Sequence, residues 1–160
     1  MLTGCGGGSD AHLVTANSIG PVRLGEPRSL VEADLGPGTT VRRQVQPFGQ
    51  LAGWTFTTVH YPRTRLSVVY GIKPGGAPFA AVLTTGSRTY VSGDGGRVGD
   101  SVQQLRGLFG FHCFGSPAID LCFQGRLFHG VGFVINHDRA TAIELAASGP
   151  DQIAVWAADA

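Results

Sequence analysis

Residues 24–36 read LGEPRSLVEADLG, and residues 98–110 read VGDSVQQLRGLFG. Both stretches begin with an apolar residue, a glycine and an acidic residue, continue with a helical segment, and end on an apolar residue and a glycine. Asp100 can cap the second helix, Pro27 suits the first turn of the first helix, and a glycine can close both. Such self-similarity predicts a tandem repeat in which each copy begins with a short helix.

The apolar residues of both stretches recur at helical spacing. Val31 and Leu35 fall on one face of the first helix. Val102, Leu105 and Phe109 fall on one face of the second. This spacing supports the two predicted helices.

Strand signals follow each helix. Stretches rich in β-branched and aromatic residues, bounded by proline or glycine, predict strands. They cover residues 54–61, 66–70 and 79–85 in the first half, and 119–124, 127–135, 141–146 and 153–156 in the second. The order predicts an α+β fold of two tandem units, each a helix followed by an antiparallel meander, whose strands form one sheet with the helices on one face. We expect the units to span residues 18–92 and 93–160 of one compact domain.

This order resembles the β-lactamase-inhibitor-protein-like fold, over roughly residues 18 to 146, and is similar to the single-unit small lipoproteins of the outer-membrane barrel assembly machinery. The segment closest to that pattern is SRTYVS at residues 87–92, leading into GGRVGDS at residues 95–101. Members of this fold bind proteins or have no known role, so the resemblance implies at most a protein-binding role. It supplies no catalytic set, and the contact loops of the β-lactamase inhibitors have no counterpart here. Only Cys5, as a lipid-bearing residue, corresponds by position.

Leu2-Thr3-Gly4-Cys5 resembles a bacterial lipobox, in which a small residue precedes a cysteine that is diacylated on sulfur. Glycines and a serine follow at residues 6–9, and such a composition is typical of a flexible tether. We expect residues 1–17 to be lipobox and tether. A signal peptide needs a basic segment and an apolar core before the cleavage site, so we expect that leader upstream of Met1. The alternative is a cytoplasmic protein with an accidental cysteine.

The other two cysteines, Cys113 and Cys122, are expected to pair if Cys5 carries lipid and the compartment is oxidising. Turn residues between them could fold one cysteine back onto the next strand. Two alternatives stay open. Both thiols could be free and buried, or they could form a metal site with His112.

The composition narrows the function classes. The chain has 160 residues, of which 42% are hydrophobic and 14% charged, so it can build the core of one folded domain. A net charge of +1 offers no electrostatic footprint for nucleic acid. No apolar run reaches the roughly 18 residues that a membrane span requires. We therefore expect membrane attachment only through lipid on Cys5.

The sequence lacks the familiar motifs of catalysis and of metal binding. Residues 93–99 read GDGGRVG, which departs from G-x-G-x-x-G and lacks the P-loop lysine, so we expect a turn between the repeats. The five histidines show no metal-ligand spacing. His137-Asp138 sits at an expected hairpin turn, which favours a surface turn over an acid–base dyad. We expect no cofactor and no metal.

The strand expected over residues 127–135 predicts a partner-binding face. By alternation its even-numbered residues point away from the core face. Glycines there weaken the strand unless something approaches the backbone closely. The residues expected on or beside this face are Asp120, Gln124, Phe128, Gly130, Gly132, Glu144 and Trp156. The alternative is that the helices pack on these glycines.

Together these patterns predict a secreted, lipid-anchored lipoprotein of the cell envelope with a non-enzymatic protein-binding or scaffolding role and an envelope protein as partner. One alternative is a small envelope hydrolase whose histidine and aspartate residues come together only in the fold. Another is a purely structural spacer. A pocket with two titratable groups within hydrogen-bond reach would favour the hydrolase.

Overall fold

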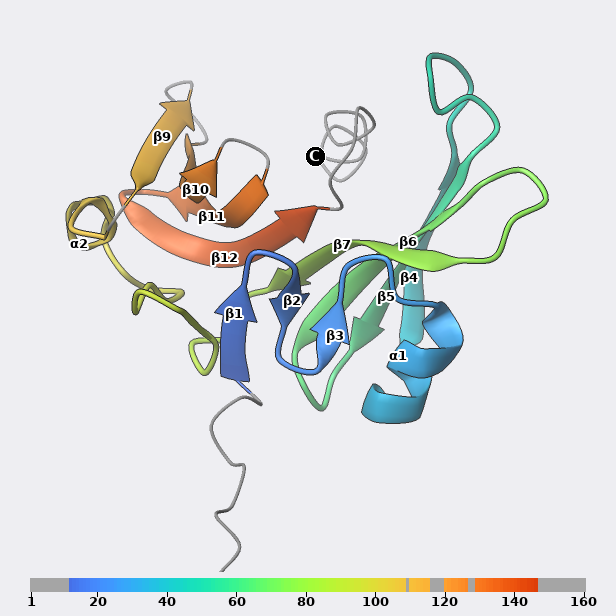
Figure 1. Cartoon of the computed structure of the whole chain (residues 1–160), viewed down its shortest axis with the longest axis horizontal. Helices are drawn as coiled ribbons and strands as arrows, with labels where there is room; N and C mark the ends of the chain where they lie inside the picture. Colours follow the sequence, from blue (N-terminus) through green and yellow to red (C-terminus); the bar gives the residue numbers. More distant parts are fainter. Residues whose placement is uncertain (1–11, 109, 116–119, 127–128, 147–160) are drawn as a thin grey trace, which may run out of the picture.

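A computed structural model describes residues 12–108, 110–115, 120–126 and 129–146 (Figure 1). The fold is α+β and consists mostly of sheet, as the sequence predicts at this level. It contains two short helices, α1 (Arg28–Leu35) and α2 (Val102–Arg106), and two sheets of unequal size. None of the described helices is long and apolar enough to cross a membrane.

The large sheet has eight antiparallel strands in the order β4-β5-β6-β7-β12-β11-β10-β9. Their bounds are Thr39–Val45 (β4), Thr55–Tyr61 (β5), Leu66–Ile72 (β6), Phe79–Thr85 (β7), Phe111–Gly115 (β9), Asp120–Arg126 (β10), His129–Asn136 (β11) and Arg139–Ala146 (β12). Strands β4–β7 neighbour one another in chain order, and so do β9–β12. The two sets meet where β7 pairs with β12. Helix α1 precedes the first set and α2 precedes the second.

A second, four-stranded sheet lies beside the large one and was not expected from the sequence. Its strands are β1 (Leu13–Thr15), β2 (Ser18–Ile19), β3 (Val22–Arg23) and β8 (Val91–Ser92), in the order β3-β2-β1-β8. Val14, Ile19 and Val22 are completely buried. The flexible tether expected over residues 1–17 therefore cannot include β1, because burial of Val14 holds that strand in the fold.

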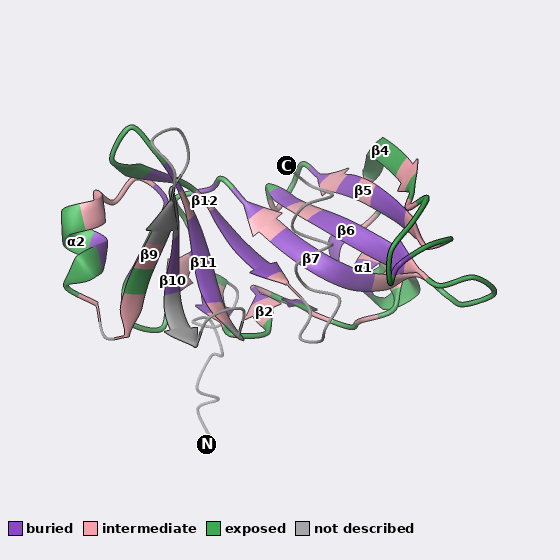
Figure 2. Ribbon diagram, turned by 90° about the horizontal axis from the view of Figure 1, so that it is seen from above, coloured by how far each residue is buried: buried purple, intermediate pink, exposed green. Residues whose placement is uncertain are grey.

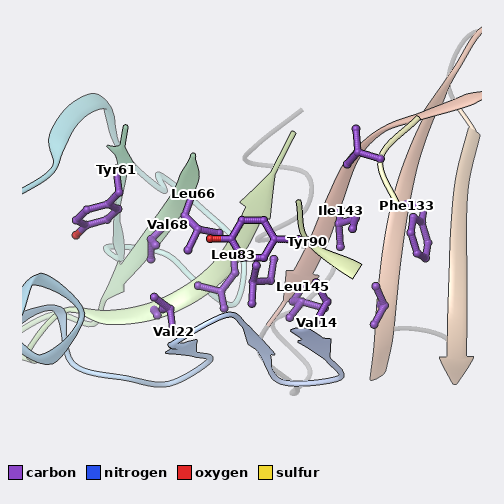
Figure 3. Packing of buried hydrophobic residues seen from close by; sticks show 14 of the residues in the cluster. Val14, Val22, Tyr61, Leu66, Val68, Leu83, Tyr90, Phe133, Ile143 and Leu145 are labelled. Carbon is purple, nitrogen blue, oxygen red and sulfur yellow. The ribbon is translucent and has the colours of Figure 1, made fainter. Parts of the chain in front are cut away.

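The main core lies between the large sheet and the elements on one of its faces. Figure 3 shows Val14 and Val22 of the small sheet facing side chains of the large sheet such as Val68, Leu83 and Leu145. Buried residues of both helices belong to the same cluster, namely Val31, Leu35 and Leu105. One apolar core therefore spans both halves of the chain.

The helix ends differ from the expectation in their capping residues. Asp100 does not cap α2; Ser101 does, because its hydroxyl accepts the Gln104 N–H while the Gln104 side chain accepts the Ser101 N–H. The Asp100 carboxylate accepts the Arg97 N–H instead. Helix α2 also ends earlier than expected, at Gly107. Helix α1 starts after Pro27 without a side-chain cap and ends at Gly36, whose φ of 79° suits glycine.

The strands predicted at residues 54–61, 66–70 and 79–85 correspond to β5, β6 and β7, and those predicted at 119–124, 127–135 and 141–146 to β10, β11 and β12. Strands β4 and β9 were missed. The strand predicted at residues 153–156 lies outside the described residues.

Candidate functional site

The disulfide prediction is confirmed. Cys113 of β9 and Cys122 of β10 are cross-strand partners with Cα atoms 4.0 Å apart, and their sulfurs are bonded. Antiparallel pairing of β9 with β10 brings one cysteine opposite the other. The bond excludes free thiols at these positions, and the described residues contain no cluster able to hold a metal ion. Cys5, the expected lipid-bearing residue, lies outside the described residues.

The predicted partner-binding face is brought together only in part. Gly132 of β11 pairs directly with Glu144 of β12, so these two positions share a face, as alternation predicted. Gly130 lies two positions from Gly132 on the same strand. Phe128 and Trp156 lie outside the described residues.

Asp120 and Gln124 occupy positions on the opposite face of the sheet from Gly132 and Glu144. Gln124 pairs with Val131, and Asp120 pairs with Ile135, whereas Gly132 pairs with Phe123. Val131 and Ile135 belong to the main core cluster. The reason for this correction is the register: each even-numbered residue of β10 pairs with an odd-numbered residue of β11, so the alternation of one strand does not carry over by residue number to the other.

Glu144 belongs to a longer polar row that sequence reasoning did not find. Glu144 pairs with Thr84 of β7, Thr84 with Ser67 of β6, and Ser67 with His60 of β5. Four polar side chains thus stand in one line across four neighbouring strands. They lie opposite the face that carries core residues such as Val59 and Val68. We call His60, Ser67, Thr84 and Glu144 the polar row.

The polar row is packed and largely shielded from water. Glu144 is only 8% exposed. His60 Nδ1 and Ser67 Oγ lie 3.2 Å apart, within hydrogen-bond distance. Thr84 Oγ1 is buried and has no hydrogen-bond partner in the described residues. Alternation in residues 54–61, 66–70 and 79–85 contained the signal, because each polar member interrupts an otherwise apolar strand.

The Ser67–His60 contact could suggest a nucleophile with its base, but the surroundings do not complete such a site. Glu144 lies two strands away from Ser67, roughly 10 Å, so it cannot orient the imidazole. Ser67 and His60 lie in strands that are paired on both sides, where the sheet pairing occupies the backbone N–H groups that an oxyanion would need. His137 and Asp138 form the β11–β12 turn with φ of 49° and 62°, the geometry of a type I′ hairpin. The geometry therefore favours packing over hydrolysis.

A second surface, which the sequence analysis missed entirely, is strand β4. It is the last strand of the large sheet, and six of its seven residues are exposed (Figure 2). The four exposed large hydrophobic residues in the described part of the chain are Leu30, Val41, Val45 and Phe48. Three of them lie in β4 or just after it, with exposures of 62%, 59% and 74%. We call β4 and Phe48 the β4 edge.

The β4 edge is held on an ordered support. The loops that follow β4 and β6 extend beyond the sheet on the same side (Figure 1). Trp54, at the end of the first loop, stacks on Phe56 and packs edge-on against Phe79, with ring centroids 6.1 and 6.0 Å apart. The Lys73 ammonium of the second loop lies 5.1 Å from the centre of the Trp54 ring. These contacts belong to a second core cluster on the face opposite the main core.

The two halves of the chain differ in charge. Residues 35–93 contain six basic side chains and no aspartate or glutamate: Arg42, Arg43, Arg63, Arg65, Lys73 and Arg88. Residues 94–146 contain five acidic and four basic side chains. The small net charge of the whole chain therefore conceals a basic first sheet half, to which the β4 edge belongs.

Comparisons with protein families, with characterised proteins and with solved structures found no match to this chain.

Proposed function

We propose that the chain is a lipid-anchored protein of the bacterial cell envelope that binds another protein without catalysing a reaction. The observation that carries the binding role is the β4 edge. A strand at the edge of a sheet presents backbone groups that can pair with another chain. This one is seven residues long and exposes Val41 and Val45 at 62% and 59%.

The exposed apolar side chains support the same proposal. Single exposed hydrophobic residues are ordinary, but a group of them rimmed by charge is typical of an interaction surface. Val41, Val45 and Phe48 form such a group beside Arg42 and Arg43. The packed Trp54 loop keeps the end of β4 in place, so a partner would meet a surface that is already ordered.

The envelope location is supported by two features. Cys5 stands in a lipobox-like tetrapeptide, and the Cys113–Cys122 disulfide is compatible with an oxidising extracytoplasmic compartment. With lipid on Cys5 and a flexible segment after it, the folded body would stand close to a membrane surface.

We also propose that the two halves are tandem copies of one unit. In support, α1 is followed by four strands in chain order, and so is α2. The last strands of the two sets, β7 and β12, pair with each other, as expected when two similar units are joined edge to edge. The arrangement is similar to the β-lactamase-inhibitor-protein-like fold.

The envelope hydrolase remains the alternative, and the Ser67–His60 contact is the observation in its favour. Replacing His60 by Gln tests it, because a base in catalysis cannot be replaced by an amide. Hydrolysis of ester or peptide substrates that is lost in His60→Gln but kept in a variant of the exposed His12 would replace the binding proposal.

The anchoring part of the proposal is tested by Cys5→Ser. Expressed behind a lipoprotein signal peptide, the protein with Cys5 should partition into detergent, and Cys5→Ser should move it to the aqueous phase. Equal partitioning of both forms would contradict lipid attachment.

The binding part is tested by cross-linking in the intact envelope. A photoreactive amino acid at position 48 should cross-link to a discrete protein, whereas the same amino acid at position 30 should not. Leu30 is a matched control, because it is 53% exposed but belongs to α1 and not to β4. Cross-links of equal yield at both positions, or at neither, would remove the support for this surface.

A further inference from the structure

We infer that β4 is a docking strand for an extended acidic segment of the partner protein, which pairs with the outer side of β4 as an additional strand of the large sheet. The inference rests on the proposed protein-binding function and names the chemistry of the partner.

Strand β4 forms one edge of the large sheet. β4 pairs with β5 and is the outermost strand of the sheet, so its other side meets no strand in the described part of the chain. Backbone N–H and C=O groups along such a side pair readily with an extended peptide, and the side chains then supply specificity. Seven residues give an incoming segment more pairing length than the five residues of β9, the opposite edge.

Strand β4 carries two positive charges at adjacent exposed positions. Arg42 and Arg43 are exposed and pair with Thr58 and Thr57, successive residues of β5, so they project from opposite faces of the strand. A flat anionic membrane can contact only one face at a time. An added strand carries side chains on both faces and can place a carboxylate beside each arginine, the favourable cross-strand arrangement. A peptide strand fits this pair of residues better than a lipid surface does.

Charge repulsion disfavours a second copy of the chain as the occupant. Arg42 is the central residue of β4, so full antiparallel pairing of two copies would place Arg42 opposite itself. Like charges directly opposite one another destabilise a strand pair. Residues 35–93 carry no aspartate or glutamate that could offset this repulsion.

The order of residues along β4 defines the motif expected in the partner segment. Arg43 and Val45 lie two positions apart on β4 and so share a face. An antiparallel segment that matches this face and also Arg42 reads apolar, polar, acidic, acidic. A blocked peptide of sequence Thr-Val-Thr-Glu-Glu-Val-Thr presents this motif, and the same peptide with both Glu replaced by Lys is its matched control.

The test measures binding of the fluorescently labelled acidic peptide to the folded protein. The unmodified chain should bind the acidic peptide and not the Lys peptide. Arg42→Glu combined with Arg43→Glu should weaken binding by about 10-fold or more, since two attractive pairs become repulsive. Arg23→Glu combined with Arg97→Glu makes the same charge change at exposed positions outside β4 and should bind as the unmodified chain does.

Hydrogen exchange separates strand pairing from loose charge attraction. Added-strand pairing should slow exchange of backbone N–H groups within Thr39–Val45, with the second sheet edge, β9, unchanged. Three results would overturn the inference: no binding of the acidic peptide, equal weakening by both arginine pairs, or binding that leaves β4 exchange unaltered. Binding of phosphatidylglycerol vesicles that depends on Arg42 and Arg43, without peptide binding, would instead assign the edge to a membrane.

The two proposals fail separately. Cross-linking at position 48 without binding of the acidic peptide would keep the protein-binding function and reject the acidic strand. Peptide binding in vitro without any cross-link in the envelope would keep the docking strand and reject the envelope partner.

Discussion

The two edges of the large sheet are treated in opposite ways. β9 is short, and the Cys113–Cys122 bond fastens it to β10. β4 is longer, exposed along almost its whole length, and held to β5 by sheet pairing with one irregularity near Val41. One edge strand is fastened to its neighbour by a covalent bond, and the other by sheet pairing alone.

The charge distribution follows the same division. The β4 edge belongs to residues 35–93, which carry six basic and no acidic side chains, while residues 94–146, which contain the disulfide, carry five acidic and four basic side chains. Basic residues on an edge also hinder pairing of like copies, a common protection against aggregation. If β4 docks an acidic strand as proposed, this charge distribution would make the edge selective, disfavouring a second copy and other basic strands.

The largest expected effect tests whether the two halves are independent. Phe133 of β11 is completely buried, and its ring centre lies 6.0 Å from that of Phe111. Phe133→Ala should lower the free energy of unfolding by about 3–5 kcal/mol. Because one core cluster joins both halves, fluorescence of Trp54 in the first half should report the same shift, measured in a Trp156→Phe background. A Trp54 transition that stays at its original midpoint would show that the halves unfold separately. Leu30→Ala, at an exposed position, is the control.

The next largest effect on stability concerns the disulfide that holds the edge strand β9. Replacing both Cys113 and Cys122 by Ala should lower the free energy of unfolding by roughly 2–3 kcal/mol, because the bond closes a short loop in the unfolded chain. The acidic peptide should still bind, since β4 lies at the opposite edge. Chemical denaturation and peptide titration of the same variant check both statements. Loss of peptide binding in a variant that is still folded would show that the two edges are coupled.

In the half of the molecule that contains β4, helix α1 contacts a pair of buried tyrosines of the sheet. Tyr61 and Tyr70 are buried with their hydroxyl oxygens 2.7 Å apart, and the Arg28 guanidinium of α1 lies 5.4 Å from the Tyr70 ring centre. Burial raises the pKa of both tyrosines above the ordinary 10.0; for Tyr70 the hydrogen bond with Tyr61 raises it further.

A raised tyrosine pKa makes stability depend on alkaline pH. The folded state holds the proton more tightly than the unfolded state, so the contribution is complete below pH 10 and is lost as the pH rises through the raised folded values. The free energy of unfolding should fall above about pH 10 by up to about 1.4 kcal/mol per pH unit for each tyrosine. Tyr61→Phe combined with Tyr70→Phe should flatten this slope, leaving the part due to buried Tyr90. An unchanged slope in the double variant would contradict the assignment.

The two helices offer a smaller comparison. α2 has a capping box from Ser101 and Gln104, whereas α1 begins without a side-chain cap. Ser101→Ala should therefore cost about 1 kcal/mol, measured by thermal unfolding. Asp100→Ala removes the residue that the sequence had suggested as the cap and should leave the capping box intact. A larger loss for Asp100→Ala than for Ser101→Ala would reverse this assignment.

The parts of the fold that could be read from the sequence are those in which burial sets the pattern. β5, β6 and β7 alternate β-branched and aromatic residues because one or both faces are covered, so their positions were predicted. β4 reads TTVRRQV and has no buried face, so no alternation marks it as a strand. The strands of the small sheet contain two or three residues each, too few to show a period.

The candidate surfaces show the same limit. Alternation placed Gly132 with Glu144 because each lies within a well-defined strand. It misplaced Gln124, since the face that a residue shares with the next strand depends on the register between the two strands. The β4 edge escaped prediction because its defining property, the position of β4 as the outermost strand among the described residues, is a result of the topology.

The smallest expected effect belongs to the Arg28–Glu32 ion pair of α1, which has no counterpart in α2 among the salt bridges of the described residues. Its Nε–Oε1 distance is 2.7 Å, but the side chains are 31% and 36% exposed, so water screens the attraction. The order of the charges along the helix is also the weaker one, with the cation nearer the N-terminus. Glu32→Gln should therefore change the free energy of unfolding by no more than about 0.5 kcal/mol.

Arg28→Gln should cost more, because it also removes the guanidinium from the Tyr70 ring. Chemical denaturation of both variants at low and high salt separates the two contacts, since only the ion pair should weaken with salt. Equal, salt-sensitive losses in both variants would mean that the Tyr70 contact adds nothing to the attachment of α1.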